Sequence, residues 1–316
     1  MVLVLQKERF LIKKKRFEPN SNTYKSYDNS IKKFYNEFNL YEEENFKAIN
    51  SDMVEDWIEN LDYKHSTVNQ IIEHNKEFCD YLQKKNLIDF NPFVVINKYS
   101  AKDLNVDSKK KIMLSEKEVI KLIESTRIRT NKDRKWAQTN FRDRAILQLI
   151  ATQGLRKNII REMKISDIER NDDIVVIEID ASRTKARINH RICFKGTAKK
   201  YFNEYLRMRE CYGIDSEYIF TTLKNKQLSP NDLDNIFIKA KNKCGFTVNK
   251  GEQLSPHNLR HFTATTLVKN NVNEMVIKSI MNWSINTRDM LNRYSNHQEA
   301  YDIEKAEVTT FLDLVD

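Results

Sequence analysis

The sequence predicts a mainly α-helical protein with one small β-sheet. Only five glycines and four prolines occur among its 316 residues, which favours long helices with few sharp turns. Over much of the chain, apolar residues recur at the alternating intervals of three and four that are typical of amphipathic helices. Two short runs rich in β-branched residues, Ile174–Ile179 and Arg187–Phe194, break that pattern and indicate strands.

The first part of the chain, residues 1–98, predicts a helical bundle. Two of its helices are expected to begin behind polar caps, one at Ser51 and one at Ser66-Thr67. The second of these is expected to end near Asn86, and Asn91-Pro92 closes the unit. An earlier helix is indicated by one apolar stripe, formed by Tyr24, Tyr27, Ile31, Phe34 and Phe38.

A polar stretch without periodicity, residues 99–112, is expected to be a linker. A second domain, residues 113–316, begins at a predicted capping box in which Ser115 caps a helix and Glu118 returns the hydrogen bond. The two strand segments are joined by residues 182–186 and are expected to form a hairpin. Further helices are expected at residues 142–150, 198–211, 231–243, 257–269 and 274–281.

The formal net charge of +9 favours an acidic partner, with nucleic acid first and an anionic membrane surface second. The membrane alternative is weak, because no segment approaches the roughly 18–20 apolar residues that a spanning helix needs. The apolar opening Met1–Leu5 is also too short for a signal peptide. A basic run ahead of the bundle either contacts DNA phosphates or forms a solvated face, and consists of Lys13, Lys14, Lys15 and Arg16.

The four cysteines are scattered through the chain and form no C-x-x-C pair. This pattern is typical of buried thiols in a reducing compartment, and it disfavours disulfides and zinc sites. We therefore expect a cytoplasmic protein that associates with the nucleoid.

Four residues suit attack on a phosphodiester. Arg156 and Arg260 fit the non-bridging oxygens of a phosphate, because a guanidinium is always charged and forks its donors toward phosphate geometry. Tyr294 carries a hydroxyl whose attack leaves a phosphotyrosine that conserves the bond energy for religation. His257 precedes Arg260 by three residues, so both project from one helical face, whereas His261 is expected to face elsewhere and to be structural.

These motifs give the second half of the chain a resemblance to the tyrosine recombinases, also called phage-integrase-type recombinases. The resemblance rests on Thr152–Arg156 followed by Ser166–Ile168, on Ser255–Thr265, and on Met281–Ser284 leading to Tyr294. The first half looks like the helical core-binding domain of that family. The resemblance implies a core-binding domain and a catalytic domain that clamp double-stranded DNA, and a 3′-phosphotyrosine intermediate. It also implies chemistry without a metal or other cofactor, and a homotetramer on two synapsed sites.

The resemblance also assigns roles near the site. It places the general acid at Lys185, in the predicted hairpin, where it protonates the departing 5′ oxygen. Arg183 is the neighbouring alternative and is otherwise expected to contact DNA. Trp283 stands where the family usually has a histidine, and Asn282 stands at the usual glycine. The indole N–H of Trp283 can donate to phosphate but cannot transfer a proton.

The chain departs from the family pattern at two further points. Ile159 occupies the place of a usual acidic residue, and Glu162 is not its substitute. The interval from Trp283 to Tyr294 is longer than the commonest spacing, as in archaeal integrases, so the resemblance extends to an archaeal or mobile-element integrase. The tail at residues 295–316 is expected to dock either on a neighbouring protomer or on its own core.

Two other functions remain open at this point. One is a topoisomerase-like enzyme that relaxes a single duplex, and the other is a decayed recombinase that only binds DNA. The DNA site, an accessory directionality factor, and the choice between integration and excision are not readable from the residues.

Overall fold

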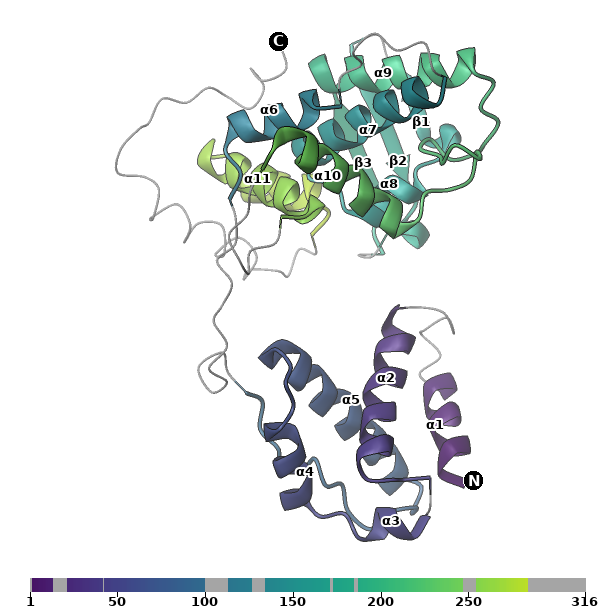
Figure 1. Ribbon diagram of the computed structural model, residues 1–316, viewed down its shortest axis with the longest axis vertical. Coiled ribbons are helices and arrows are strands. Elements are labelled where there is room, and N and C mark those ends of the chain that lie inside the picture. Colours follow the sequence, from purple (N-terminus) through teal and green to yellow (C-terminus); the bar gives the residue numbers. More distant parts are fainter. Residues whose placement is uncertain are drawn as a thin grey trace. The chain divides into compact units, whose positions relative to one another are not determined.

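The computed structural model describes residues 2–13, 22–41, 43–99, 113–126, 134–170, 173–184, 187–246 and 254–283. The chain divides into two compact units, Met1–Ser108 and Lys109–Asp316, here called unit 1 and unit 2 (Figure 1). Each unit has its own hydrophobic core. No helix in these described ranges is long and apolar enough to cross a membrane.

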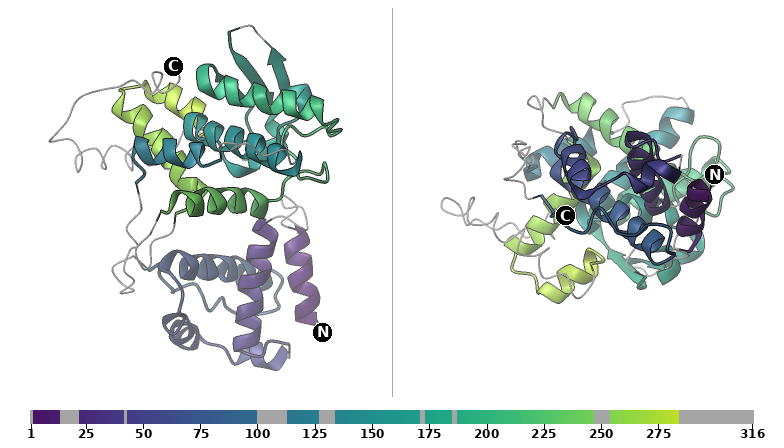
Figure 2. Two further views of the ribbon diagram at one scale, coloured as in Figure 1. Left: turned by 45° about the horizontal axis from the view of Figure 1, so that its top comes forward. Right: turned by 90° about the horizontal axis from the view of Figure 1, so that it is seen from below.

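Unit 1 is a bundle in which α2 packs directly against α5 and α1 packs against both (Figure 2). The ring of Phe34 on α2 is fully buried and lies at the centre of its core. Four other rings contact it, those of Phe38, Phe46, Trp57 and Phe93. The described helices are α1 (Val2–Lys13), α2 (Asn22–Glu37), α3 (Glu43–Lys47), α4 (Ser51–Glu59) and α5 (His65–Gln83).

Asn91 explains why the chain turns after α5. Its side chain, which is buried, donates to the Lys76 carbonyl over 2.9 Å and to Asp80 Oδ1 over 2.6 Å. Its own Oδ1 accepts the backbone N–H of Phe93 over 2.9 Å. One amide thus fixes the segment to α5 and starts the turn that directs Phe93 into the core.

The predicted helix caps in unit 1 were wrong by one or two residues. Helix α4 is capped by Asn50, whose side chain accepts from the Met53 N–H over 2.9 Å, and Ser51 is the first helical residue. Helix α5 begins at His65 without a side-chain cap, so Ser66-Thr67 lies within its first turn. Neighbouring polar residues compete for the cap position, and only the path of the chain decides between them.

Unit 2 is built around α7, which packs against α9, α11 and α6; Figure 1 shows it in the middle of the unit with α9 beside it. Its helices are α6 (Glu116–Glu124), α7 (Arg134–Gln153), α8 (Lys157–Glu162), α9 (Gly196–Cys211), α10 (Pro230–Cys244), α11 (Pro256–Lys269) and α12 (Glu274–Ile280). The predicted capping box of Ser115 and Glu118 is present at the start of α6.

The sheet of unit 2 has the order β1-β2-β3 and is antiparallel throughout. Strands β2 (Val175–Ile179) and β3 (His190–Phe194) form the predicted hairpin, and β1 (Ile168–Arg170) adds a third strand. A strand of three residues is too short to show a period of two, so the sequence did not reveal it. The predicted fold class, mainly α with a small sheet, is confirmed.

Gly154 lets the ends of two distant helices approach each other. It lies between α7 and α8 with φ +57°, in the left-handed region that favours glycine. A Cβ added to it would lie 2.5 Å from Met281 Sδ and 3.5 Å from Thr263 Cβ. Met281, which follows α12, is fully buried at this contact. A side chain at this position would therefore have to displace the end of the buried Met281 side chain.

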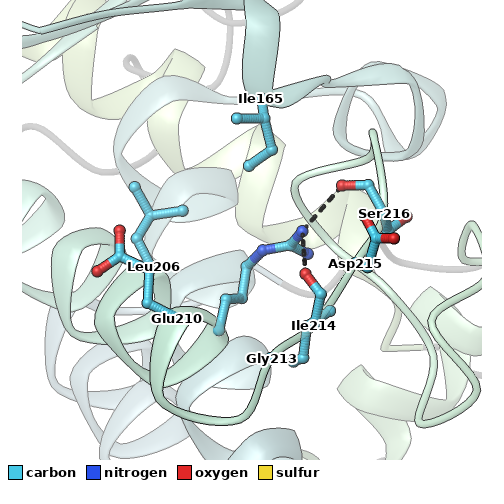
Figure 3. A pocket seen from close by; sticks show the side chains of 8 residues that line it. Ile165, Leu206, Glu210, Gly213, Ile214, Asp215 and Ser216 are labelled. Atoms are coloured by element: carbon cyan, nitrogen blue, oxygen red, sulfur yellow. Dashed lines mark hydrogen bonds between the residues drawn. The ribbon is translucent and has the colours of Figure 1, made fainter.

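Arg209 holds the loop that follows α9 in shape. Its side chain is 5% exposed and donates to the carbonyls of Ile219 over 2.7 Å and Ser216 over 3.0 Å. A longer contact of 3.4 Å reaches the Ile214 carbonyl. Figure 3 shows the pocket at this loop, with the bonds to Ile214 and Ser216 dashed. The guanidinium donates hydrogen bonds to several backbone carbonyls that would otherwise be paired in a helix or a sheet.

We expect Gly154→Ala to destabilise unit 2 more than Gly213→Ala does. Both glycines have φ near +60°, so each alanine carries the left-handed cost of about 1–2 kcal/mol. At Gly213 no atom lies within 4 Å of the added Cβ, whereas Gly154→Ala must also displace Met281. Urea denaturation of the two variants measures the difference, and equal losses would contradict the proposed packing.

We expect Arg209→Met to lower the free energy of unfolding by about 2–3 kcal/mol, because buried carbonyls lose their donor. Arg207→Met is the matched control, since Arg207 is exposed on the same helix. Thermal unfolding of the two variants measures the effect. A similar melting temperature for both would show that the loop does not depend on the guanidinium.

Candidate active site

Two arginines from distant parts of unit 2 converge on one backbone turn. The turn follows α12 and comprises Met281, Asn282 and Trp283. Arg156 donates from Nη1 to the Asn282 carbonyl over 2.6 Å and, over 3.3 Å, to that of Met281. Arg260 donates from Nη2 to the same Met281 carbonyl over 2.6 Å, and from Nη1 to the Gly154 carbonyl. The sequence predicted that these arginines act together, and the structure brings them together.

The local sequence explains the turn. Asn282 has φ +46°, a left-handed conformation that asparagine tolerates better than most residues. The Trp283 N–H returns to the Lys278 carbonyl over 2.8 Å and closes the end of α12. Carbonyl groups at the C-terminal end of a helix carry partial negative charge, which favours nearby cations. The turn therefore binds the guanidiniums with neutral acceptors.

The arginines are held without loss of their positive charge. Arg260 is 4% exposed, and Arg156 is half-buried. Burial lowers the pKa of Arg156 from its ordinary value, yet a guanidinium remains charged at neutral pH. Among the described residues no carboxylate forms an ion pair with Arg156. Its charge is thus available to an anion.

Trp283 packs against Arg260 and lies in an apolar cluster. Its side chain is 3% exposed and belongs to a small cluster with Ala264, Leu267 and Met281. The Cζ atom of Arg260 lies 5.8 Å from the indole ring, within the range of a cation–π contact. Trp283 therefore supports Arg260 directly, while donation from its N–H to a phosphate stays a prediction.

His257 lies in the first turn of α11 and is exposed, one turn before the buried Arg260. The N-terminal end of a helix favours anions, because its N–H groups and dipole point outward there. His261 was expected to face elsewhere, and this was wrong: its ring meets that of His257 edge-on, with the centroids 4.4 Å apart. Residues four apart lie on one helical face, which is why the two rings meet.

His190 is a buried histidine that the sequence analysis missed. It begins β3, is 4% exposed, and its Nε2 lies 3.2 Å from the Ile280 carbonyl. Its pKa is lowered to about 4, first by burial and also by the charges of Arg156 and Arg260, while the hydrogen bond to Ile280 opposes them. The sequence did offer one signal: His190 lies on the same face of the predicted strand as the apolar residues Ile192 and Phe194.

Two residues noted near the site have intramolecular roles. Ile159, at the place of a usual acidic residue, is 2% exposed and packs in the main core of unit 2. Arg183 forms a bidentate pair with Asp167, with distances of 2.7 and 2.8 Å, and also donates to the Glu162 carbonyl over 2.9 Å. The hydrogen bond with Asp167 raises the pKa of Arg183. Contact of Arg183 with DNA stays a prediction.

Other predicted site residues lie outside the described residues. They include the nucleophile Tyr294, the general acid Lys185, and the basic residues Lys14, Lys15 and Arg16. Lys13 ends α1, but its side chain is not described. In the described ranges there is no group of three or more His, Cys, Asp or Glu side chains that is placed to hold a metal ion.

The described part of the site can bind a phosphodiester. Two guanidiniums fixed by backbone carbonyls provide preset donors and positive charge, and an exposed histidine lies one helical turn away. Preset donors of this kind stabilise the charge that develops in a phosphoryl-transfer transition state.

Relatives of known type share this sequence pattern. A tyrosine recombinase of Agathobacter rectalis is 26% identical over 274 residues, which covers 84% of this chain and 83% of the relative. The tyrosine recombinase XerC of Rickettsia peacockii is 25% identical over 275 residues, with 84% and 83% covered.

Solved structures share the fold. A lambda integrase dimer bound to a COC′ core site aligns with a TM-score of 0.68 at 15% identity, over 97% of this chain and 80% of that one. XerH site-specific recombinase bound to a palindromic difH substrate aligns with a TM-score of 0.67 at 20% identity, over 89% and 79%.

The model of the phage integrase family matches residues 112–300, which is more than half of the chain and includes both arginines, the turn and Tyr294. With that match and the converging arginines, the protein belongs to the phage integrase family and is a tyrosine recombinase, a site-specific DNA strand-transferring enzyme.

Proposed function

We propose that this recombinase cleaves and rejoins DNA through a 3′-phosphotyrosine formed by Tyr294, on a phosphate held by Arg156 and Arg260. The observation that carries the proposal is the convergence of both guanidiniums on the Met281 carbonyl. That arrangement fixes two forked donors side by side, which is the geometry that suits the non-bridging oxygens of one phosphate.

In the proposed cleavage step, the Tyr294 oxygen attacks phosphorus and the bond from phosphorus to the 5′ oxygen breaks. Lys185 gives its proton to the departing 5′ oxygen, and the proton of Tyr294 leaves toward His257 or solvent. The bond energy is kept in the phosphotyrosine. Attack by a 5′ hydroxyl of another strand reverses the step, releases Tyr294 and joins the new strand.

The arginines stabilise the transition state in this scheme, and Trp283 keeps Arg260 in place. Ile159 leaves the site without one usual carboxylate, and the carbonyls of Gly154, Met281 and Asn282 accept from the guanidiniums instead. A carbonyl orients a guanidinium without cancelling its charge. The substitution is therefore compatible with phosphate binding.

The proposed substrate is double-stranded DNA, with Lys13, Lys14, Lys15 and Arg16 on its phosphates. Four protomers would assemble on two synapsed sites in the nucleoid. One structural neighbour, lambda integrase, was solved as a tetramer bound to a Holliday junction and aligns with a TM-score of 0.65 over 90% of this chain. That likeness supports the assembly through the fold alone.

We expect a covalent protein–DNA adduct on nicked suicide duplexes. Because the target is unknown, the substrate is found by trapping adducts from a pool of duplexes with a randomised core. Tyr294→Phe should form none, since it lacks the nucleophile. Arg156→Ala and Arg260→Ala should slow adduct formation about 100-fold or more, as loss of a preset donor does.

Arg207→Ala is the control, because it removes an exposed arginine of α9 and should react at the wild-type rate. An adduct that survives Tyr294→Phe would overturn the choice of nucleophile. Specific DNA binding without any adduct would favour the decayed recombinase. Relaxation of supercoiled DNA by a monomer would favour the topoisomerase-like enzyme.

We expect replacement of all four residues of the basic run by Gln to weaken DNA binding almost equally at every sequence. Each phosphate contact contributes about 0.9 to the slope of log affinity against log salt concentration, so the slope should fall by roughly 3–4. Fluorescence anisotropy at several salt concentrations measures it. An unchanged slope would assign the run to a solvated face.

A further inference from the structure

We propose that His190 is a positioning residue that holds, from the sheet, the turn on which Arg156 and Arg260 are seated. The inference rests on the proposed recombinase function and adds to it a residue of a different element. In the resemblance to the family, the roles around the phosphate fall on the two arginines, the hairpin lysine, His257, Trp283 and Tyr294. None of them falls on the start of β3.

The geometry ties β3 to the turn. Strand β3 packs against α12, and His190 Nε2 lies 3.2 Å from the carbonyl of Ile280, the last residue of α12. A carbonyl only accepts, so Nε2 carries the hydrogen and Nδ1 is the bare nitrogen of the neutral ring. Nδ1 is buried and has no hydrogen-bond partner among the described residues.

Three successive carbonyls are held in this way. Ile280 accepts from His190, Met281 from both arginines, and Asn282 from Arg156. The two peptide planes are joined through the φ and ψ torsions of Met281, so a shift of the Ile280 carbonyl is expected to disturb the Met281 carbonyl as well. His190 therefore acts on the guanidiniums through the backbone, without touching the phosphate.

The surroundings make this hydrogen bond important. A groove of about 640 Å³ lies along β3 and α12, and His190 and Ile280 both line it. Side chains do not fill the space on that side of the strand and the helix. The hydrogen bond between His190 and Ile280 therefore lies in the wall of this groove and joins β3 to the end of α12.

The charge state of the ring fits a positioning role. At neutral pH the pKa of about 4, caused first by burial, keeps the ring neutral beside Arg156 and Arg260. The titratable side chains that line the groove beside His190 are those of Arg191, Cys193 and Lys195, from β3 and the residue after it. Helix α12 lines the groove with Ser279 and Ile280, which do not titrate. A neutral donor orients the turn without adding a third cation beside the guanidiniums.

The sign of the pH effect follows from the lowered pKa. An unfolded histidine titrates near pH 6.5. Between that pH and about 4 the unfolded chain takes up a proton that folded His190 does not, so stability present above pH 6.5 is lost as the pH falls. Protonation of the folded ring also places a charge beside two guanidiniums.

The test compares His190→Gln with His190→Leu. The Nε2 group of Gln reaches about as far as that of His and donates without titrating, whereas Leu fills the space without donating. We expect His190→Leu to lower the single-turnover cleavage rate on a trapped suicide duplex about tenfold to 100-fold, the range of a small misplacement. DNA affinity should change less than twofold, and His190→Gln should recover most of the rate.

Ile192→Ala is the control for loss of packing. Ile192 is buried on the same face of β3 and makes no hydrogen bond to the turn through its side chain. It should lower the melting temperature while the cleavage rate at a temperature well below melting stays near wild type. Equal rates for wild type and His190→Leu would overturn the proposal, as would a failure of His190→Gln to recover any rate.

A measurement that needs no catalysis separates this inference from the function. NMR of the histidine rings, with His190 assigned from His190→Gln, should show the Nε2–H tautomer and a pKa well below 6.5. A pKa near 6.5 or the Nδ1–H tautomer would overturn the inference even if wild type cleaves DNA. Absence of an adduct with wild type, with the expected NMR result, would instead count against the proposed function.

Discussion

The carbonyl of Met281 is the contact on which the site depends, because it accepts hydrogen bonds from Arg156 and Arg260 together. Gly154 leaves room for the Met281 side chain, which any Cβ at that position would meet. The carbonyl also needs α12, whose end presents it, and the buried Trp283 that follows. Elements from across unit 2 thus meet at one backbone oxygen, and a change in any of them reaches the guanidiniums.

The hydrogen-bond acceptors of both arginines are neutral backbone carbonyls, and this affects how the arginines can bind an anion. A carboxylate beside Arg156 would orient it and cancel part of its charge, whereas carbonyl groups orient it and leave that charge for a phosphate. Ile159, which packs in the core at the position of a usual acid, fits this arrangement. Asp167 instead binds Arg183, in the segment that connects β2 to β3. Among the described residues, a carboxylate thus supports Arg183, whereas backbone carbonyls support Arg156.

Much of the fold was readable from local pattern. The capping box of Ser115 and Glu118 and the hairpin of β2 and β3 depend on neighbouring residues, so they were predicted and confirmed. Strand β1 was not, because a strand of three residues shows no period and forms only beside β2. The cap of α4 was misplaced by one residue, since Asn50 and Ser51 are both good caps and the chain path selects Asn50.

The sequence by itself determined which charged groups are present, because the motifs around Arg156 and Arg260 contain guanidinium groups that stay charged in any environment. Tertiary structure decided what holds them, because backbone carbonyls and a glycine contact leave no residue-type signature at a fixed spacing. The same reason hid His190, whose role depends on β3 meeting α12. The edge contact of His257 with His261 is different, because residues four apart share one face of α11 and the spacing alone could have indicated it. Side-chain identity is local, whereas partners separated by a hundred residues meet only in the folded chain.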